Sequence, residues 1–345
     1  MRIMKMKQRI ILILLSSFIA VGTSPLVAQE GLQRTKAIRL TADVTKAINR
    51  SLKFMSDSQN PNGSFGKGSL PAATSLVLMS FMLQGHIPGE GKYGKHMVKA
   101  VDYLLSIQKN GYFHDETSRG MYEHALVVLG LSEVWGQSPD PRLRDALKQG
   151  VNVILNAQNA EGGWRYAPRP YEADVSCSAM QVVALASAKE AGIAVPHKTL
   201  KRAAAYFAAC EVRSTGGFSY QLLAGAPMGG ADFARSAAAT LALMLGGQRK
   251  HPAARGGIAY VSATPEVSFN SMNHYFYGHY YGAQVMYQAG DKYFNRYYTK
   301  ISKALLAQQN KEGMWGAGGR TDFVKSSFAV LILGIPYRFL PIYQK

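Results

Sequence analysis

A short turn pattern recurs at intervals of about 50 residues, and this periodicity restricts the possible folds more than any other feature. An amphipathic run, a glutamine, a glycine-containing turn and an aromatic residue follow one another in four segments, Gln59–Phe65, Gln108–Phe113, Gln158–Trp164 and Gln309–Trp315. A fifth segment, Cys210–Phe218, keeps the turn without the glutamine. The first residues are separated by 49, 50, 52 and 99 residues, so a degenerate unit is expected near Tyr260. The spacing therefore predicts six repeats.

Each unit has the pattern of two different helices. In Leu143–Ala157 the apolar residues form one stripe and the charged residues occupy the opposite face, which is typical of a helix with one side in water. In Phe233–Leu245 and Val175–Ala188 nearly every position is apolar or small, which indicates a helix buried on all sides. Six outer helices alternating with six inner ones predict an all-α fold, a closed α/α toroid with essentially no sheet. An open superhelix is the alternative, but it would leave the inner helices partly in water.

The turn residues are predicted to be structural. The glycines allow the positive φ angles of a tight turn between antiparallel helices. The glutamine is expected to satisfy unpaired backbone amides at the start of the next helix, and the aromatic side chain is expected to cover the junction.

The N-terminus is predicted to be an export signal, with residues 1–28 removed and residues 29–345 forming the toroid domain. Four basic residues precede an apolar run, Ile10–Gly22, and small residues near Ala28 offer a cleavage point. The run is shorter than the roughly 20 apolar residues of a membrane span, so we expect no transmembrane span in the mature chain. The expected location is periplasmic or secreted, and an uncleaved N-terminal anchor is the alternative.

The chain is strongly basic, with a formal net charge of +18 that falls to about +14 without the signal. This charge favours anionic partners, either a small molecule or the anionic surface of a cell envelope, although a basic surface also keeps a protein soluble. No nucleic-acid motif accompanies it, so a nucleic-acid partner is not expected. The two cysteines, Cys177 and Cys210, are predicted to lie at the same end of neighbouring helices without forming a disulfide.

The glutamine–glycine–aromatic segments resemble the QW repeats of terpenoid cyclases and of protein prenyltransferase β-subunits. The similarity extends over the mature chain and is strongest to exported bacterial proteins with prenyltransferase and squalene-oxidase repeats. The stretch Tyr275–Gln284 and the tail Ile335–Tyr343 are similar to that group. This resemblance implies the toroid fold and, more weakly, an isoprenoid-type ligand.

The catalytic motifs of that superfamily are missing from the sequence. There is no Asp-x-Asp-Asp acid motif and no Cys-Gly-Glu-Gln thioester motif. Prenyltransferases bind zinc through Asp-x-Cys and a later histidine, whereas Asp174-Val-Ser-Cys177 places its cysteine one residue late and Tyr277 occupies the histidine position. A slip of one residue on a helix turns a ligand by about 100°, so we predict no metal site and no cofactor.

Residues at the starts of the inner helices are expected to meet at one cavity mouth, because all the turns lie at the same end. Three aspartates are the candidate catalytic groups, although each is also a plausible helix cap: Asp174, Asp232 and Asp322. Asp174 is the first choice, because the resemblance implies a functional aspartate there. The candidate ligand-binding residues are Tyr122, His124, Cys177, Arg235, His274, Tyr277, His279 and Lys325, and Thr74 lies at the same level.

Ten aromatic residues lie between Tyr275 and Tyr298. Those on the inner helix are expected to line a hydrophobic cavity, whereas Tyr293, Phe294, Tyr297 and Tyr298 are expected to pack between outer helices. The leading functional hypothesis is binding of a lipid-like or isoprenoid-like ligand in the central cavity, or a scaffold role. The alternatives are an isoprenoid transferase or cyclase-like enzyme, and a polysaccharide hydrolase or lyase using carboxylates at the mouth.

Overall fold

The computed structural model describes residues 38, 40–138, 140–263, 274–337 and 340. All the described helices belong to one unit, residues 36–345. The expected export signal, residues 1–28, lies outside the described residues. Within the described part of the chain, no helix combines the length and the apolar composition that a membrane crossing requires.

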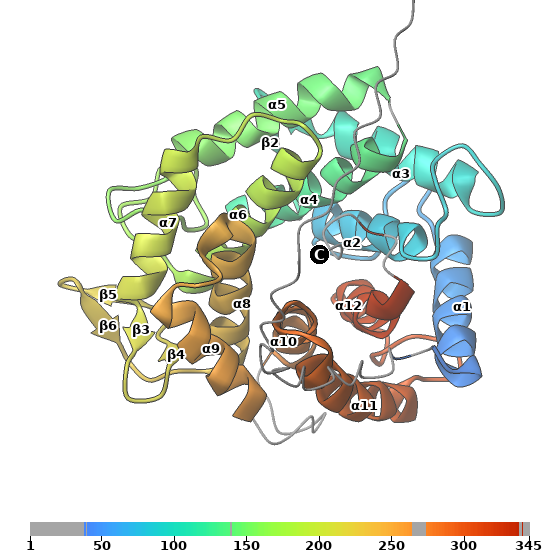
Figure 1. Cartoon of the computed structure of the whole chain (residues 1–345). Coiled ribbons are helices and arrows are strands. Elements are labelled where there is room, and N and C mark those ends of the chain that lie inside the picture. The colour runs from blue at the N-terminus through green and yellow to red at the C-terminus, as the bar shows by residue number, and fades with distance from the viewer. Residues whose placement is uncertain (1–37, 39, 139, 264–273, 338–339, 341–345) are drawn as a thin grey trace, which may run out of the picture. The chain divides into compact units, whose positions relative to one another are not determined.

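Twelve α-helices of the described chain alternate between an outer and an inner wall (Figure 1). The outer helices are α1 (Ala42–Asp57), α3 (Gly94–Ser106), α5 (Pro141–Asn156), α7 (His197–Ala209), α9 (Pro252–Ala263) and α11 (Asp291–Gln308). The inner helices are α2 (Leu70–Met82), α4 (Met121–Gln137), α6 (Val175–Glu190), α8 (Phe233–Leu243), α10 (Tyr275–Ala289) and α12 (Asp322–Gly334). A π-helical turn, Met244–Gln248, follows α8, and a 3₁₀ turn, Ile335–Tyr337, follows α12.

The six inner helices form a closed ring. Each packs against the next in sequence order, from α2 to α12, and α12 packs against α2. In the outer wall, α1 contacts both α11 and α12, which brings the first repeat beside the last. The predicted α/α toroid of six helical hairpins is therefore confirmed. The degenerate unit expected near Tyr260 consists of α9 and α10, and the turn expected between them falls in residues 264–273, outside the described residues.

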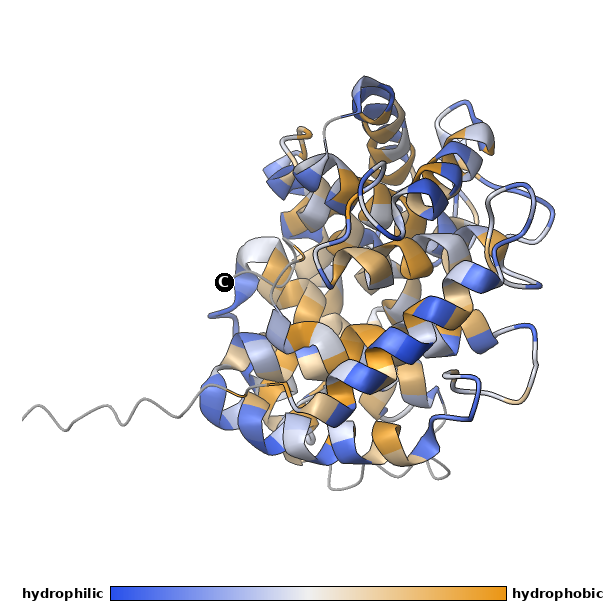
Figure 2. Ribbon diagram, turned by 90° about the vertical axis from the view of Figure 1, so that its right-hand side faces the viewer, coloured by the Kyte–Doolittle hydropathy of each residue, from blue (hydrophilic) through white to orange (hydrophobic). Residues whose placement is uncertain are grey.

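The two walls differ in burial as their sequences predict. In α2 every residue from Pro71 to Met82 is buried, because neighbouring inner helices and the outer wall surround it. In α5 only one stripe is buried, and it includes Leu143, Leu147 and Ile154. Figure 2 shows hydrophilic residues on the outward faces of outer helices and hydrophobic residues facing the interior.

Three short two-stranded hairpins lie in the connections, although essentially no sheet was expected. They pair β1 (Gln108–Lys109) with β2 (Tyr112–Phe113), β3 (Glu211–Val212) with β4 (Gly217–Phe218), and β5 (Gln221–Leu223) with β6 (Ala226–Met228). The first two arise where a repeat turn is extended enough for its two arms to pair, so they add local hydrogen bonds without changing the helical architecture.

The repeat glutamines bind carbonyl groups, which corrects the expectation that they satisfy amides. Gln158 Nε2 donates to Gly162 O at 2.8 Å, in its own turn, and to Thr199 O at 3.0 Å, in the next outer helix. Gln59, Gln108 and Gln309 make the equivalent pair of bonds. The side-chain amide therefore joins each turn to the following repeat.

The turn glycine is required at the same junction. Gly162 has a φ of +95°, and a Cβ built on it would lie 2.5 Å from the carbonyl oxygen of Arg202. Any other residue would suffer both an unfavourable backbone conformation and a clash with the next outer helix. The glycine thus lets consecutive outer helices approach closely enough for the glutamine to bridge them.

The structure agrees with the prediction for the two cysteines and with only part of the prediction for the aromatic run. Cys177 and Cys210 are both buried and free, as expected. Phe294 and Tyr298 are buried in the outer wall, but Tyr293 is 42% exposed, so its expected packing between outer helices is wrong. It lies on the outward face of α11.

Candidate functional site

A cavity of ≈ 450 Å³ opens at the end of the ring where the inner helices begin. Each of the six inner helices contributes a side chain from its first turns or from the residues just before it. Of the residues predicted for a common mouth, five line this cavity: Tyr122, Asp232, Arg235, His274 and Tyr277. The other lining residues are Ser69, Ala72, Arg119, Glu123, Leu126, Tyr166, Ser176, Tyr220, Ala234, Thr321, Val324 and Phe328.

The connection before α6 supplies one wall of the cavity. It is fixed to the start of α4, because Met121 N donates to Tyr166 O at 2.9 Å. The preceding residue, Gly120, has a φ of +73°, and a Cβ there would lie 2.1 Å from the same carbonyl oxygen. This close approach places Tyr166 at the cavity edge, where its hydroxyl lies 3.5 Å from that of Tyr220.

Glu123 is a buried carboxyl group at the cavity wall. It lies in the first turn of α4 and is only 2% exposed. Burial raises the pKa of Glu123, and the neighbouring Ser69 hydroxyl and the Arg119 backbone oppose this shift only in part. Its Oε2 atom is buried and has no hydrogen-bond partner among the described residues. One of its two carboxyl oxygens therefore has an open hydrogen-bonding position.

An ion pair and an arginine–tyrosine contact form the α8 side of the cavity. Asp232 caps α8 by accepting from Arg235 N at 3.1 Å, and its carboxylate lies 3.9 Å from the guanidinium. That guanidinium donates to Gly230 O at 3.2 Å and lies 6.0 Å from the ring centroid of Tyr220. The Nε of Arg235 is buried without a hydrogen-bond partner among the described residues. Like Glu123, this group retains a free hydrogen-bonding position.

Tyrosine rings provide the flat surfaces of the site. The Tyr122 and Tyr277 ring centroids are 6.2 Å apart, and Tyr277 packs edge-on against Tyr281 at 4.8 Å. The Tyr277 hydroxyl is buried without a hydrogen-bond partner within the described chain. These rings come from α4 and α10, which lie on different sides of the ring (Figure 1).

Asp174 is not among the residues that line the cavity, but it lies near two lining tyrosines, Tyr220 and Tyr277. Its Oδ1 accepts from Cys177 N at 2.8 Å, which makes it the N-cap of α6, and its Oδ2 is buried without a hydrogen-bond partner among described residues. Burial raises the pKa of Asp174 to about 6, against the stabilising influence of the Cys177 amide and the Arg165 guanidinium. Its carboxyl group is therefore half-protonated near pH 6 and mostly ionised at pH 7.

His124, a predicted ligand-binding residue, is a structural residue of the repeat. Its Nδ1 accepts from Phe113 N at 3.1 Å, and its Nε2 lies 3.0 Å from Gly150 O. Other repeats use a hydroxyl for the same purpose, binding the amide of the turn aromatic: Thr74 with Phe65, Ser178 with Trp164, Ser236 with Phe218 and Ser326 with Trp315. Burial lowers the pKa of His124 to about 4, so the ring is neutral and both nitrogens are occupied.

Four other predicted residues lie outside the cavity lining. Cys177 is buried, with its Sγ 3.7 Å from Gln181 Nε2, and burial raises its pKa well above the usual range. Asp322 binds the amides of the preceding glycine loop through Oδ2, and Lys325 pairs with its Oδ1 at 3.3 Å. His279 packs between α8 and α11, where its Nδ1 lies 2.6 Å from the Tyr297 hydroxyl.

These positions do not fit a zinc site. The described residues contain no cluster of three or more histidine, cysteine or acidic side chains arranged to hold a metal ion. Ser176, in the position where the prenyltransferase pattern has its cysteine, lines the cavity, whereas Cys177 points into the core. The one-residue slip in the motif therefore turns the thiol away from the mouth.

Several lining residues are not among those predicted from the sequence. Glu123 stands between two residues that were singled out, Tyr122 and His124, and an acid in the first turn of a fully buried helix was the available signal. Arg119, Tyr166 and Tyr220 lie in connections whose course depends on tertiary contacts, and no local pattern marks them.

Comparison with known proteins supports the fold. No sequence-family model and no curated protein sequence matches the chain. Among solved structures, the α-1,6-mannanase GH76A of Salegentibacter sp. HEL1_6 is similar with a TM-score of 0.66 and 9% identity, covering 86% of this chain and 99% of that one. The GH76 α-mannanase of Bacteroides thetaiotaomicron has a TM-score of 0.64, 10% identity and coverages of 86% and 96%. The type II terpene cyclase MstE from Scytonema has a TM-score of 0.59, 14% identity and coverages of 87% and 100%. The chain thus shares its toroid fold with proteins of two different chemistries.

Proposed function

We propose that this protein binds a hydroxyl-rich small molecule of the oligosaccharide class in the cavity at the start of the inner helices. The observation that supports this most is a set of buried polar atoms around one cavity without hydrogen-bond partners in the described chain: Glu123 Oε2, Arg235 Nε and Tyr277 Oη. A buried polar atom without a partner costs about 1–3 kcal/mol. A ligand that fills those positions recovers that free energy.

The chemistry of these atoms favours a sugar over a hydrocarbon. A carboxyl oxygen accepts hydrogen bonds and an arginine Nε donates them, whereas a sugar hydroxyl does both. The tyrosine rings of Tyr122 and Tyr277 offer apolar faces for the C–H face of a sugar ring. An isoprenoid chain would cover the same rings but would leave the three polar atoms unsatisfied.

The carboxyl groups also give the site acid–base capacity. Glu123 on α4, Asp174 before α6 and Asp232 before α8 are contributed by three consecutive inner helices. Burial raises the pKa of Glu123 and that of Asp174, so both groups retain protons more readily than an exposed carboxyl group does. A protonated and an ionised carboxyl group are what glycoside hydrolysis requires. An inactive form of the similar mannanase lacks two consecutive aspartates, and no such pair occurs in this sequence.

Binding of an isoprenoid-like ligand is the second candidate. The apolar part of the lining favours it, with Leu126, Val324 and Phe328 beside the tyrosine rings. The fold is shared with a type II terpene cyclase that was solved with a geranylgeranyl substrate. Without an Asp-x-Asp-Asp motif, this candidate is a binding function only.

The two candidates are separated by direct binding measurements. Isothermal titration with α-1,6-mannotetraose and with cello-, malto- and chito-oligosaccharides is compared with titration of detergent-dispersed geranylgeraniol. We expect at least one oligosaccharide to bind, and Glu123→Gln and Tyr277→Phe to weaken that binding while Tyr293→Phe, on the outer wall, leaves it unchanged. Saturable binding of geranylgeraniol alone would overturn the proposal.

A further inference from the structure

The outer helix α11 has an exposed basic face. Arg296, Lys300 and Lys303 are all exposed, and their spacing places them on one side of the helix with the partly exposed ring of Tyr293 at its beginning. No acidic residue follows Asp291 within α11. The three cations therefore line up along about 10 Å of the helix axis without an acidic side chain between them.

These charges have no partners within the described chain. The seven ion pairs among the described residues involve none of the three cations. Elsewhere the outer wall does balance its charges, since Arg142 on α5 bridges Asp102 of α3 and Asp140. Like charges three or four positions apart destabilise a helix. A partner that supplies negative charge would remove that cost.

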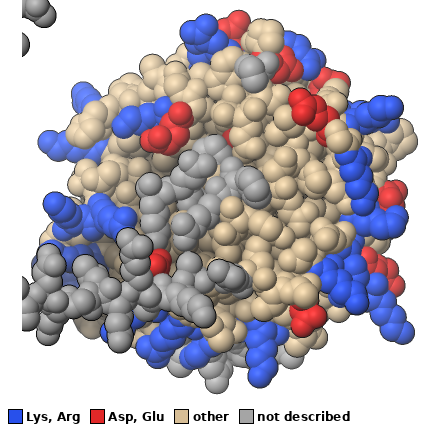
Figure 3. Space-filling model, turned by 45° about the vertical axis from the view of Figure 1, so that its right-hand side comes forward, with Lys and Arg blue, Asp and Glu red and all other residues tan. Residues whose placement is uncertain are grey.

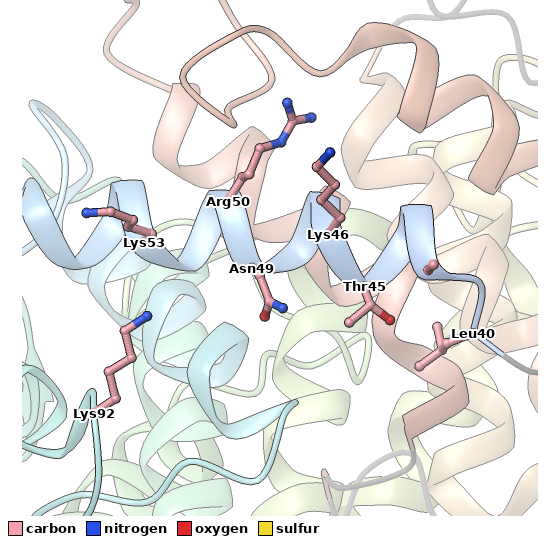
Figure 4. A pocket seen from close by; sticks show the side chains of 8 residues that line it. Leu40, Thr45, Lys46, Asn49, Arg50, Lys53 and Lys92 are labelled. Atoms are coloured by element: carbon pink, nitrogen blue, oxygen red, sulfur yellow. The ribbon is translucent and has the colours of Figure 1, made fainter.

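A second basic cluster lies on the neighbouring helix α1. An open hollow of ≈ 620 Å³ there is lined by four basic residues, Lys46, Arg50, Lys53 and Lys92, and by the uncharged residues Leu40, Ala42, Thr45 and Asn49 (Figure 4). In Figure 4, Lys46 and Arg50 extend to the same side of α1, and Lys92 extends from the loop before α3 toward Lys53. Lys53 is already paired with Asp57 at 2.7 Å. The hollow therefore adds cations to those of α11.

The two clusters lie on α1 and α11, the outer helices that meet where the last repeat closes on the first. Helix α1 packs against α11, and Arg50 donates a hydrogen bond to Gln309, the residue directly after α11. Figure 3 brings the side of Figure 1 that carries α1 forward and shows lysine and arginine side chains around the margin of that face, with acidic side chains between some of them. We define the basic seam as Lys46, Arg50, Lys92, Arg296, Lys300 and Lys303.

We propose that the basic seam binds a linear acidic polysaccharide, whose carboxylates pair with the cations and whose sugar rings pack on Tyr293. A chain-like partner matches a row of charges along a helix better than a compact anion does. A lipid surface is less suited, because attachment to a bilayer requires several exposed apolar side chains. Tyr293 is the one large apolar residue exposed on α1 or α11 in the described structure. This proposal does not depend on the ligand of the central cavity.

The test uses the full protein and polygalacturonate as the probe. The triple variant Arg296→Gln, Lys300→Gln and Lys303→Gln removes three exposed charges without touching the core or the ring closure. Because the variant loses three exposed ion pairs with the probe, it should bind polygalacturonate about tenfold more weakly. Binding by the unaltered protein should also weaken as salt increases, because the screening length shortens.

A matched control variant separates an effect of the basic seam from an effect of the protein's total charge. The variant Lys198→Gln, Lys201→Gln and Arg213→Gln removes the same charge around α7, where these side chains are also exposed. It should bind the probe like the unaltered protein. Equal weakening of both variants would overturn the proposal by making the effect one of total charge. No binding of polygalacturonate would also overturn it, and so would binding only to phosphatidylglycerol vesicles, which would point to a lipid surface.

Discussion

Gln309 Nε2 donates a hydrogen bond to the carbonyl oxygen of Ala47 at 2.8 Å, joining the last repeat to the first outer helix across 262 positions of sequence. The same side chain bonds to Gly313 O in its own turn at 2.9 Å. Gln158 makes the equivalent two bonds between consecutive repeats. The closure of the ring therefore uses the same local contact as every other junction of this kind, and only its sequence separation differs.

Replacing Gln309 should selectively loosen the junction between the last repeat and the first. We expect Gln309→Ala to cost about 1–3 kcal/mol, because the Ala47 carbonyl loses its side-chain donor. Hydrogen–deuterium exchange should show faster exchange in α1, since loss of this contact frees one end of the repeat array. Gln158→Ala serves as the control, with faster exchange at α7. Faster exchange in all outer helices alike would contradict a local role for the junction.

His124 should be essential for stability and irrelevant for ligand binding. His124→Ala leaves Phe113 N buried without its acceptor, so we expect a loss of about 1–3 kcal/mol. Denaturant unfolding measures this change, and titration with the cavity ligand should give an unchanged affinity. His124→Ser should recover part of the loss, because serine accepts the same bond in other repeats. Loss of affinity in a variant of normal stability would show that His124 contributes to ligand binding.

Asp174 should make stability depend on pH. Because burial raises its pKa from 3.8 to about 6, the folded state holds this proton more tightly than the unfolded state. The associated stabilisation is complete below about pH 3.8 and is lost as the pH rises through 6, a total of about 3 kcal/mol. Asp174→Asn keeps a capping side chain and has no titrating group.

The melting temperatures of Asp174→Asn and of the unaltered protein should therefore diverge with pH. The variant should gain stability relative to the unaltered protein as the pH rises from about 4 to about 6.5, and the difference should stay constant at higher pH. A difference that does not change with pH would show that Asp174 titrates normally and acts only as a helix cap.

Ligand binding in the cavity should require both the Nε group of Arg235 and the carboxyl oxygen of Glu123. Arg235→Lys keeps the charge but removes Nε and the planar fork, so we expect binding of the oligosaccharide identified by titration to weaken about 10- to 100-fold. Glu123→Gln should weaken binding to a similar degree with little change in melting temperature. Titration calorimetry measures both. Unchanged affinity in both variants would exclude this side of the cavity as the binding surface.

The thiols of Cys177 and Cys210 should be present but slow to react. Both are buried and free, and burial raises the pKa of each, that of Cys210 to about 12. A thiol reagent should titrate two groups in the unfolded, unreduced protein and react slowly with the folded protein at neutral pH. Rapid modification of the folded protein would show that the mouth end of α6 opens in solution.

The sequence by itself determined the repeat number, the two kinds of helix and the toroid. These features follow from local patterns, because the spacing of apolar residues in helices such as α5 and α8 determines whether a helix is buried on one side or on all sides. It also placed Tyr122, Arg235 and Tyr277 at the cavity, because residues at equivalent positions in a repeat come to the same level of the ring.

Only the tertiary structure decided which polar groups are free to bind. His124 and Glu123 are neighbours in the first turn of α4, yet the histidine bonds to Phe113 and Gly150 while a glutamate oxygen is left without a partner among described residues. A rotation of about 100° between adjacent helical positions sends one side chain into the wall and the other to the cavity. The partners of each lie in other repeats or connections, so no pattern within α4 distinguishes them.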